Sequence, residues 1–326
     1  MTGGVGVESG WFDVVVRSAT RDAGNVLILD LERPDGALPS FTAGSHVAIH
    51  CGEDLIRHYS LFGPRTSPTS YRLGVKVADD SRGGSKWIGE SARPGQTMRI
   101  SFPRNNFPLV PGLRDYLFLS GGIGITPLLS MLEELRDQGR RARLVHLCRS
   151  AQDLAFAPWL QDLGTFHDVH VHCDSAVGSL YDIVAELERA ADDTAVYCCG
   201  PTPMMNIVRS FGVQRSRIDD FHFEFFASAG PVDATDASAA FTAVLHSTGR
   251  EVNVAAGETL LAALRRAGVS VESECEEGVC GTCTLRVVSG LPDHRDFYLT
   301  SSERAANDVV LACVSRCMGT RFELDL

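Results

Sequence analysis

Three cysteines in one short stretch carry the most specific chemistry in the sequence. Cys275, Cys280 and Cys283 are spaced C-x4-C-x2-C, and Cys313 follows farther along the chain. A plant-type 2Fe-2S cluster takes three thiolates from one loop with this spacing and a fourth from elsewhere. The sequence therefore predicts that these four cysteines are the ligands of a 2Fe-2S cluster.

Two other interpretations of the cysteines are open at this stage. Zinc sites usually take two close pairs rather than three cysteines plus one, and free thiols are often buried as packing groups. Cys317 exceeds the four-ligand count, so we expect it to be a packing thiol, and we expect His294 to be structural. Four glutamates beside the cysteines predict either a docking surface or a solvated acidic loop: Glu272, Glu274, Glu276 and Glu277.

A second group of residues suits a flat ring and a phosphate. In R-H-Y-S-L, Arg57 and Tyr59 share one face of a predicted strand, while Ser60 lies on the other face or at its edge. Tyrosine stacks on rings, and arginine offers a planar cation. An ordinary amphipathic strand is the alternative interpretation.

The stretch S-R-G-G-S-K begins at Ser81 and precedes a possible short helix. Backbone N–H groups in such a turn, with a helix start behind them, favour a terminal phosphate. A plain Gly-Gly turn is the alternative. The candidate phosphate-binding residues are Arg82, Gly83, Gly84 and Ser85.

A predicted buried strand, Tyr116 to Ser120, runs directly into G-G-I-G-I-T-P. Thr126 is the expected N-cap of the following helix, with Pro127 at its first position. Strand, glycine turn and helix start form an arrangement that suits a pyrophosphate, although the spacing is not G-x-G-x-x-G. The turn glycines are Gly121, Gly122 and Gly124.

Other candidate binding residues follow later strands. Cys199, Gly200 and Pro201 form a turn of small residues where a flat ring can lie close to the backbone, and H-F-E-F-F ends the same region; both patterns are also compatible with core packing. Arg149 is placed to meet an adenosine phosphate, and Asp174 to bind a ribose hydroxyl, so the choice between NADH and NADPH is open.

The elements that must position these residues fall into three groups. Residues 1–110 contain short β-rich runs punctuated by Gly and Pro, which predicts an antiparallel β-barrel. Residues 111–228 alternate strands with helices, which predicts a doubly wound α/β nucleotide domain. Residues 229–239 have a linker composition. Residues 240–326 contain a hairpin, a helix and the cysteine loop, and form the expected 2Fe-2S ferredoxin domain of α+β class.

Composition limits the function further. The 326 residues are 44% apolar and 22% charged, with a net charge of -11 that argues against nucleic acid as a partner. No apolar run approaches the roughly 20 residues of a membrane span, so we expect no membrane partner. The N-terminal residues lack a signal-peptide pattern, so we expect a cytoplasmic protein, in which ten cysteines favour metal and redox roles over disulfides.

These motifs, in this order and over nearly the whole chain, resemble the phthalate dioxygenase reductase family, which includes vanillate O-demethylase reductases. The resemblance implies a flavin-binding barrel and a nicotinamide-binding domain, both like those of ferredoxin-NADP reductases, followed by a plant-type ferredoxin. It also implies FMN rather than FAD, because the family's flavin phosphate would bind at residues 82–85.

The resemblance assigns roles residue by residue. Arg57, Tyr59 and Ser60 would hold the flavin, with Val75 and Lys76 lining its pyrimidine side. Thr126 and the glycines before it would face flavin and nicotinamide, and Cys199 would lie near the site of hydride transfer. Phe226 would cover the flavin ring, although the adjacent Phe225 is an equal candidate for stacking.

The expected function follows from electron counting. NADH delivers two electrons together as hydride, whereas a 2Fe-2S cluster takes one at a time, and a flavin between them accepts hydride and releases electrons singly. The chain shows no oxygen-activating motif. By family likeness we expect a reductase that supplies a separate Rieske-type oxygenase acting on an aromatic or similar small substrate. A reductase for a cytochrome P450 and a redox sensor are the alternatives.

Overall fold

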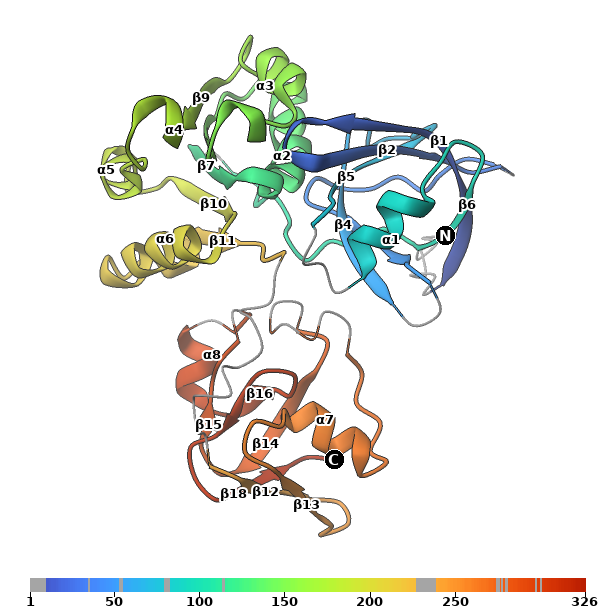
Figure 1. Ribbon diagram of the computed structural model, residues 1–326. Helices are drawn as coiled ribbons and strands as arrows, with labels where there is room; N and C mark the ends of the chain where they lie inside the picture. The colour runs from blue at the N-terminus through green and yellow to red at the C-terminus, as the bar shows by residue number, and fades with distance from the viewer. Residues whose placement is uncertain are drawn as a thin grey trace, which may run out of the picture. The chain divides into compact units, whose positions relative to one another are not determined.

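The computed structural model describes residues 10–34, 36–52, 55–78, 83–112, 115–226, 239–273, 276, 278, 281–296, 298–299 and 301–326. The chain forms two compact units, Met1–Glu224 and Phe225–Leu326 (Figure 1). None of the helices in these ranges is long and apolar enough to cross a membrane.

The first unit begins with a closed barrel of six antiparallel strands in the order β1-β2-β5-β4-β3-β6. The start of β1 alternates between buried and more exposed residues, because successive side chains of a strand point to opposite faces. Phe12 and Val14 are buried, for example, while Asp13 between them is exposed. The strands are β1 (Trp11–Asp22), β2 (Val26–Glu32), β3 (His46–His50), β4 (Ile56–Phe62), β5 (Tyr71–Lys76) and β6 (Thr97–Ser101), and the 3-10 turn Ala23–Asn25 joins β1 to β2.

One helix, α1 (Gly84–Ser91), lies between β5 and β6 in the chain and packs on the barrel (Figure 1). Its Ile88 is fully buried and belongs to the barrel core, together with Leu29, Ile49 and Leu73. The glycine start of α1 is thereby held next to β4, the strand that carries the R-H-Y-S-L motif.

The same unit continues as a parallel five-stranded sheet in the order β11-β10-β7-β8-β9. Parallel strands need crossover helices, which here alternate with the strands along the chain. The strands are β7 (Tyr116–Gly121), β8 (Arg143–Cys148), β9 (Asp168–Cys173), β10 (Ala195–Cys199) and β11 (Phe221–Phe223). The helices are α2 (Thr126–Asp137), α3 (Ala157–Leu163), α4 (Asp174–Val177), α5 (Ile183–Arg189) and α6 (Thr202–Gln214), with 3-10 turns at Gly122–Ile125, Ala151–Asp153 and Ile218–Asp220.

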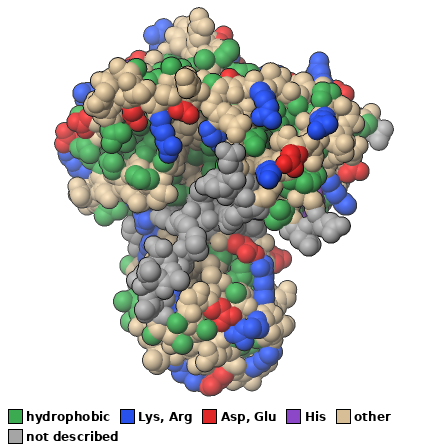
Figure 2. Space-filling view, in the orientation of Figure 1, with side chains coloured by type: hydrophobic (Ala, Val, Ile, Leu, Met, Phe, Trp, Pro, Cys, Tyr) green, Lys and Arg blue, Asp and Glu red, His purple; other side chains and the backbone are tan. Residues whose placement is uncertain are grey.

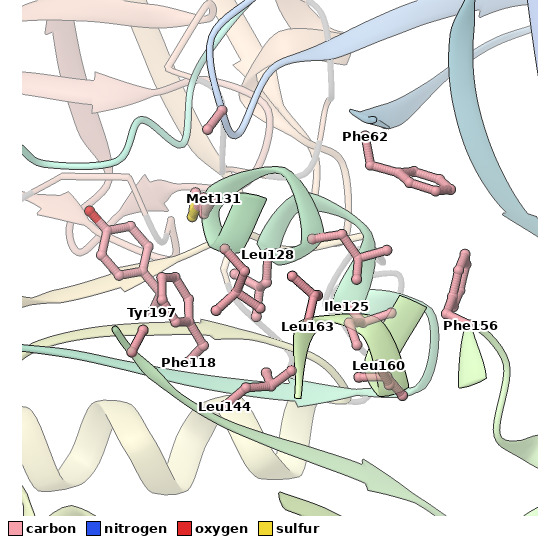
Figure 3. Close-up of a cluster of buried hydrophobic side chains, with 14 of the residues drawn as sticks. Phe62, Phe118, Ile125, Leu128, Met131, Leu144, Phe156, Leu160, Leu163 and Tyr197 are labelled. Carbon is pink, nitrogen blue, oxygen red and sulfur yellow. The ribbon is translucent and has the colours of Figure 1, made fainter. Parts of the chain in front are cut away.

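The barrel and the parallel sheet share one hydrophobic core, which Figure 3 shows in close-up. Phe62 of β4 meets Phe156, just before α3, edge to face with ring centroids 5.7 Å apart. Two hydrogen bonds join the same parts: Phe156 N donates to Asp22 Oδ2 over 2.8 Å, and Gly44 N donates to Ser130 Oγ over 3.1 Å. This shared core fixes the barrel strands relative to the carboxyl ends of the sheet.

The second unit is built on a five-stranded sheet in the order β13-β12-β18-β14-β16, with a short pair β15-β17. Its core includes Phe241, Leu264 and Phe322. The strands are β12 (Phe241–Leu245), β13 (Glu251–Val254), β14 (Thr284–Ser289), β15 (Pro292–Asp293), β16 (Val309–Leu311), β17 (Arg316–Cys317) and β18 (Arg321–Leu324). Its two helices are α7 (Leu260–Arg266) and α8 (Ser301–Ala306).

The architecture confirms the predicted fold class of barrel, doubly wound α/β sheet and α+β ferredoxin-like part. One local prediction was wrong. Thr126 is not an N-cap: it is the first residue of α2, the cap position belongs to Ile125, and the Thr126 hydroxyl donates to Ile123 O over 3.1 Å. The 3-10 turn Gly122–Ile125 runs directly into α2, so no capping side chain is needed at that point.

Candidate active site and cluster site

Strand β4 carries the three predicted flavin-binding residues. Arg57 and Tyr59 are partly buried, and Ser60 is buried. Tyr59 packs against the barrel core, and burial raises the pKa of its hydroxyl, so this group stays protonated at neutral pH. The alternation that the sequence predicts is present, with Arg57 and Tyr59 on one face of β4 and Ser60 on the other.

The glycine start of α1 lies directly against Arg57. A Cβ atom on Gly84 would stand 2.4 Å from Arg57 Cγ and 2.9 Å from its Nε, so only glycine fits beside this side chain. Gly83 takes φ +97, a conformation that favours glycine, and Ser85 Oγ accepts a hydrogen bond from Ala78 N over 3.4 Å. The cradle therefore suits a phosphate group beside a guanidinium, although Arg82 lies outside the described residues.

The turn after β7 touches the end of β10 through the backbone. A Cβ on Gly124 would stand 2.3 Å from Cys199 O, and one on Gly121 would stand 2.5 Å from Pro201 Cδ. Gly200 also has no room for a side chain, since a Cβ added to it would stand 2.9 Å from Gly121 N. These glycines bring two strand ends together at the edge of the sheet where open α/β folds bind ligands.

The same turn lies against the barrel. A Cβ on Gly74 of β5 would stand 2.9 Å from Thr126 Cγ2, so Thr126 packs where β5 passes the start of α2. Val75 and Lys76 follow Gly74; Val75 is fully buried, whereas Lys76 is exposed and its ammonium donates to Gly24 O. Gly74, which directly precedes the two predicted flavin-facing residues of β5, is thus the neighbour of Thr126, whose contact with a nicotinamide stays a prediction.

Glu224 is a candidate functional residue that the sequence analysis did not single out. Ser60 Oγ donates to Glu224 Oε2 over 3.3 Å, a contact between residues 164 positions apart. Burial raises the Glu224 pKa to about 8, with the Ser60 hydrogen bond opposing the shift. Burial, and then the Glu224 carboxylate, raise the pKa of the Cys199 thiol well above its usual value. The only signal in the sequence is an acidic residue between aromatics in H-F-E-F-F.

Glu224 is held by the sheet as well as by Ser60. Its backbone N–H donates to Cys198 O over 3.2 Å, directly after the parallel pairing of β10 and β11. Ser60, Cys199 and Glu224 come from three separate elements and form one group of polar side chains between barrel and sheet. The arrangement can hold a proton at the Glu224 carboxyl near neutral pH.

Arg149 and Asp174 stand at the ends of neighbouring strands β8 and β9. Arg149 is exposed and Asp174 is partly exposed. Ser175 N donates to Arg149 O over 2.9 Å, which ties the two loops together. Asp174 Oδ1 lies 3.4 Å from His172 Nε2. The structure brings both predicted nucleotide-binding side chains to one edge of the sheet, the carboxyl end where such ligands bind.

In the second unit, two of the four predicted cluster ligands are described. Cys283 and Cys313 are buried in one core, with 2% and 3% of their surfaces exposed. Ala312 N donates to Cys283 O over 3.1 Å, so the two cysteine segments lie side by side as a continuation of the β14–β16 pairing. Cys275 and Cys280 lie outside the described residues.

The loop that carries the first three cysteines turns at glycines. Gly281 has φ +77, and its Cβ would stand 2.3 Å from the ring of Tyr298. Gly278 has φ +74 and faces Val314 just as closely, with a Cβ distance of 2.6 Å. The described glycines of this loop therefore take conformations and close contacts that fit a tight cluster loop, and Cys283 and Cys313 are buried near it.

Other predictions concern the residues around the two sites. Phe226 has 40% of its surface exposed and Phe225 is partly buried; both belong to the second unit, so the stacking of Phe226 on a flavin stays a prediction. The His294 side chain is 9% exposed, with its Nδ1 3.7 Å from Asp296 Oδ1, and its structural role stays a prediction. Cys317 donates to Arg321 O over 3.4 Å.

Comparison with protein families identifies two of the three parts. Residues 244–318 match the 2Fe-2S iron-sulfur cluster binding domain, and residues 118–210 match the oxidoreductase NAD-binding domain. The chain therefore contains a 2Fe-2S-binding domain and an NAD-binding domain, in the order that the sequence motifs predict.

Whole-chain similarities are stronger still. The chain is 39% identical over 317 residues to the vanillate O-demethylase oxidoreductase of a Pseudomonas species, covering 96% of this chain and 99% of that protein. An intact type IV self-sufficient cytochrome P450 monooxygenase is 33% identical with a TM-score of 0.81; it covers 100% of this chain, which spans only 43% of that structure. Phthalate dioxygenase reductase, described as a modular structure for electron transfer from pyridine nucleotides to [2Fe-2S], is 32% identical with a TM-score of 0.70 and covers 97% of this chain and 98% of its own. The chain belongs to the phthalate dioxygenase reductase family, an oxidoreductase family whose members serve as reductase components of oxygenase systems.

Proposed function

We propose that this reductase takes hydride from NADH onto FMN and passes single electrons through its 2Fe-2S cluster to a separate Rieske-type oxygenase. The final substrate of that oxygenase would be aromatic or similarly small, with O-demethylation or ring hydroxylation as the reaction. The observation that carries the proposal is the group formed by Ser60, Cys199 and Glu224. Ser60 Oγ of the barrel donates to Glu224 Oε2 after the last strand of the sheet, and the Glu224 carboxylate acts on the Cys199 thiol, which supports a shared site for the flavin and the nicotinamide.

Positioning is the protein's main contribution to hydride transfer. Thr126 and the turn glycines would set the nicotinamide against the flavin ring, because Gly74 of β5 packs directly on Thr126. The Ser60 hydroxyl, held by Glu224, would hydrogen-bond the flavin edge. With a pKa near 8, Glu224 would exchange a proton near neutral pH while the ring changes oxidation state.

Bound flavin supplies the conversion of a two-electron donor into a one-electron donor. We propose FMN because the cradle of Gly83, Gly84 and Ser85 beside Arg57 offers one compact phosphate site. Arg82 would complete this cradle. Tyr59, Val75 and Lys76 would line the ring, and Phe226 would cover it. The test is release of the flavin by heat and its separation by chromatography, which should yield FMN without FAD.

Asp174 supports NADH over NADPH. Its carboxylate stands at the end of β9 beside the Arg149 backbone, where it would accept hydrogen bonds from the ribose hydroxyls and repel a 2′-phosphate. Gly200 and Pro201 would contact the nicotinamide ring, and Arg149 would pair with the dinucleotide phosphates. We expect kcat/KM to be higher for NADH than for NADPH. Asp174→Asn should lower the ratio of kcat/KM for NADH to kcat/KM for NADPH.

Reduction of cytochrome c, an artificial acceptor, tests the relay as a whole. NADH with purified protein should reduce cytochrome c at a rate that depends on bound flavin and intact cluster absorption. Protein whose cluster has been removed should still reduce its flavin with NADH but should lose cytochrome c reduction. Equal cytochrome c rates with and without the cluster would refute the proposed path. Cys275, Cys280, Cys283 and Cys313 are the proposed ligands.

A second candidate acceptor is a cytochrome P450. It is favoured by the similarity to a self-sufficient P450, in which this fold is part of a single chain with the monooxygenase. Reconstitution separates the two proposals: the reductase should support turnover by a Rieske oxygenase and not by a P450. Turnover by the P450 and not by the Rieske oxygenase would instead identify a cytochrome P450 as the electron acceptor.

A further inference from the structure

Two neighbouring strands of the NAD-binding sheet end in cysteines that face each other. Cys148 is the last residue of β8 and Cys173 the last of β9, and they are direct partners in the parallel register. Their sulfur atoms lie 2.7 Å apart. Cys148 is buried, while Cys173 is partly exposed. The relay from NADH to the cluster uses neither residue.

The backbone geometry at this pair already suits a disulfide. Adjacent strands run about 4.8 Å apart, and disulfides join Cα atoms that are about 4.4–6.8 Å apart. Directly paired residues of neighbouring strands also place their side chains on the same face of the sheet. Closing the bond therefore needs a small approach of the two sulfurs and little movement of the backbone.

A metal site does not explain the pair equally well. Within the described ranges, no three side chains of histidine, cysteine, aspartate or glutamate are grouped so that they could hold a metal ion. Asp174 lies near the cysteines, but its carboxylate faces His172 at 3.4 Å. Two thiols with no third ligand indicate redox chemistry at sulfur.

We propose that Cys148 and Cys173 form an oxidisable dithiol, a modification site at the edge of the NAD-binding sheet. The oxidant is hydrogen peroxide. The Cys173 sulfur attacks the peroxide, which breaks the O–O bond and gives a sulfenic acid on Cys173 and one water. The Cys148 sulfur then forms the S–S bond and displaces the sulfenic hydroxyl, which leaves with the Cys148 proton as a second water. Two thiols are oxidised and one peroxide is reduced to two waters.

The two cysteines have different roles in this sequence of steps. Cys173 reacts first because it is partly exposed, and peroxide can reach it. Burial, followed by the hydrogen bond with Cys173, raises the pKa of the Cys148 thiol to about 12, so Cys148 stays protonated until Cys173 has been oxidised. Cys148 is thus the resolving cysteine.

The consequence for the enzyme rests on the proposed function. Arg149 and Asp174 each follow one cysteine directly, and the hydrogen bond from Ser175 N to Arg149 O couples their loops. A bond between the sulfurs joins the two strand ends covalently, so Arg149 and Asp174 can no longer adjust independently when the dinucleotide binds. Because binding groups must reach their productive positions together, we expect the KM for NADH to rise about tenfold, and dithiothreitol to reverse the rise.

Peptide mapping tests the modification site independently of activity. The full-length holoenzyme is treated with one equivalent of peroxide, alkylated and digested with trypsin. Cleavage after Arg143, Arg149 and Arg189 places Cys148 and Cys173 in separate peptides, 144–149 and 150–189, with one cysteine each. Mass spectrometry should find these two peptides linked, and the link should vanish with dithiothreitol. Cys317→Ser, the matched control, should leave it unchanged.

Single variants test the order of attack. In Cys148→Ser, dimedone should label Cys173 after peroxide treatment, because the sulfenic acid has no resolving partner. In Cys173→Ser, Cys148 should stay unlabelled. Absence of the linked peptide together with unlabelled Cys173 overturns the proposal. If the linked peptide forms but the KM for NADH is unchanged, the modification site stands and its effect on NADH binding is refuted. If the protein forms the link but has no NADH activity, only the proposed function is refuted.

Discussion

At the scale of residues, the chemistry of Glu224 depends strongly on its surroundings. Its carboxyl accepts a hydrogen bond from Ser60, and burial raises its pKa from 4.5 to about 8. In the unfolded chain the same carboxyl titrates near 4.5, so above that pH unfolding releases a proton that the folded protein keeps. The contribution of Glu224 to the stability of the first unit therefore falls as pH rises from 4.5 to about 8.

Replacing Glu224 by glutamine should remove this pH dependence. The amide has the shape of the protonated acid and no charge to desolvate, so Glu224→Gln should match the wild type near pH 5 and exceed it by about 1–2 kcal/mol at pH 8. Urea denaturation followed by tryptophan fluorescence measures this, because Trp11, Trp87 and Trp159 all belong to the first unit. Glu90→Gln, at an exposed position, is the control. If the free energy of unfolding depends on pH in the same way in Glu224→Gln and in the wild type, the raised pKa of Glu224 is contradicted.

Ser60→Ala should slow hydride transfer without unfolding the barrel. The substitution removes the hydroxyl that joins β4 to Glu224, and the loss of one such hydrogen bond corresponds to roughly tenfold in rate. Stopped-flow measurement of flavin reduction by NADH gives the rate. Ser91→Ala, at the end of α1, should leave it unchanged. An unaltered rate in Ser60→Ala would remove Ser60 from the site.

At the scale of elements, glycines decide where segments may approach one another. Gly257 and Gly278 both lie in the second unit with similar backbone conformations, φ +77 and φ +74, but they differ in surroundings. Nothing lies within 4 Å of a Cβ on Gly257, whereas a Cβ on Gly278 would stand 2.6 Å from Val314 Cγ2 and 3.1 Å from Asp296 Cα. Comparing alanine substitutions at these two glycines therefore separates the effect of backbone strain from the effect of a steric clash at the cysteine loop.

Gly278→Ala should therefore lose much of its iron-sulfur cluster, and Gly257→Ala should keep it. Both substitutions carry a similar backbone cost of about 1–2 kcal/mol, so the difference between them reports the displacement of the loop by Val314 and the Asp296 backbone. Iron and sulfide content per chain, with the visible absorption of the cluster, measures the outcome. Equal cluster content in the two variants would show that the loop tolerates the contact.

At the scale of the whole molecule, electron delivery to a separate protein depends on surface charge. The chain carries a net charge of -11, yet on the face shown in Figure 2 basic and acidic side chains are interspersed. Of the four glutamates beside the cluster cysteines, Glu274 and Glu277 lie outside the described residues. Glu276 is paired with Arg265 at 2.7 Å, and Glu272 is exposed. Glu272 is therefore the better test of docking by this loop.

We expect the rate of electron transfer to the partner oxygenase to fall as ionic strength rises, because salt screens attraction between the acidic loop and a basic patch on the partner. Glu272→Gln should lower the second-order rate constant by about threefold at low salt and have little effect at high salt. Glu90→Gln, an exposed change on the first unit, serves as the matched control. A rate that does not respond to salt would argue for docking through another surface.

The sequence by itself determined the order of the three parts and most of the local structure. The strand bounds at Val26–Glu32, His46–His50 and Asp168–Cys173 follow from alternation and turn residues, which are short-range signals. Cys283 and Cys313 could be predicted as cluster ligands because ligation of a cluster restricts residue type and spacing together. The predicted start of α2 was wrong by one position, because a threonine before a proline resembles a helix N-cap followed by its first residue. The sequence has no comparable signal for the 3-10 turn that precedes the helix.

Only the tertiary structure decided which distant residues meet. Ser60 and Glu224 share a hydrogen bond across 164 positions, and the sulfurs of Cys148 and Cys173 approach each other across 25. Such contacts depend on strand order and on the core that barrel and sheet share, and local propensity carries no information about either. Burial then sets the chemistry of these groups, because the pKa of a carboxyl or thiol depends on the solvent that packing removes. Residue types and spacings are written in the sequence, whereas proximity and desolvation arise only when the chain has packed.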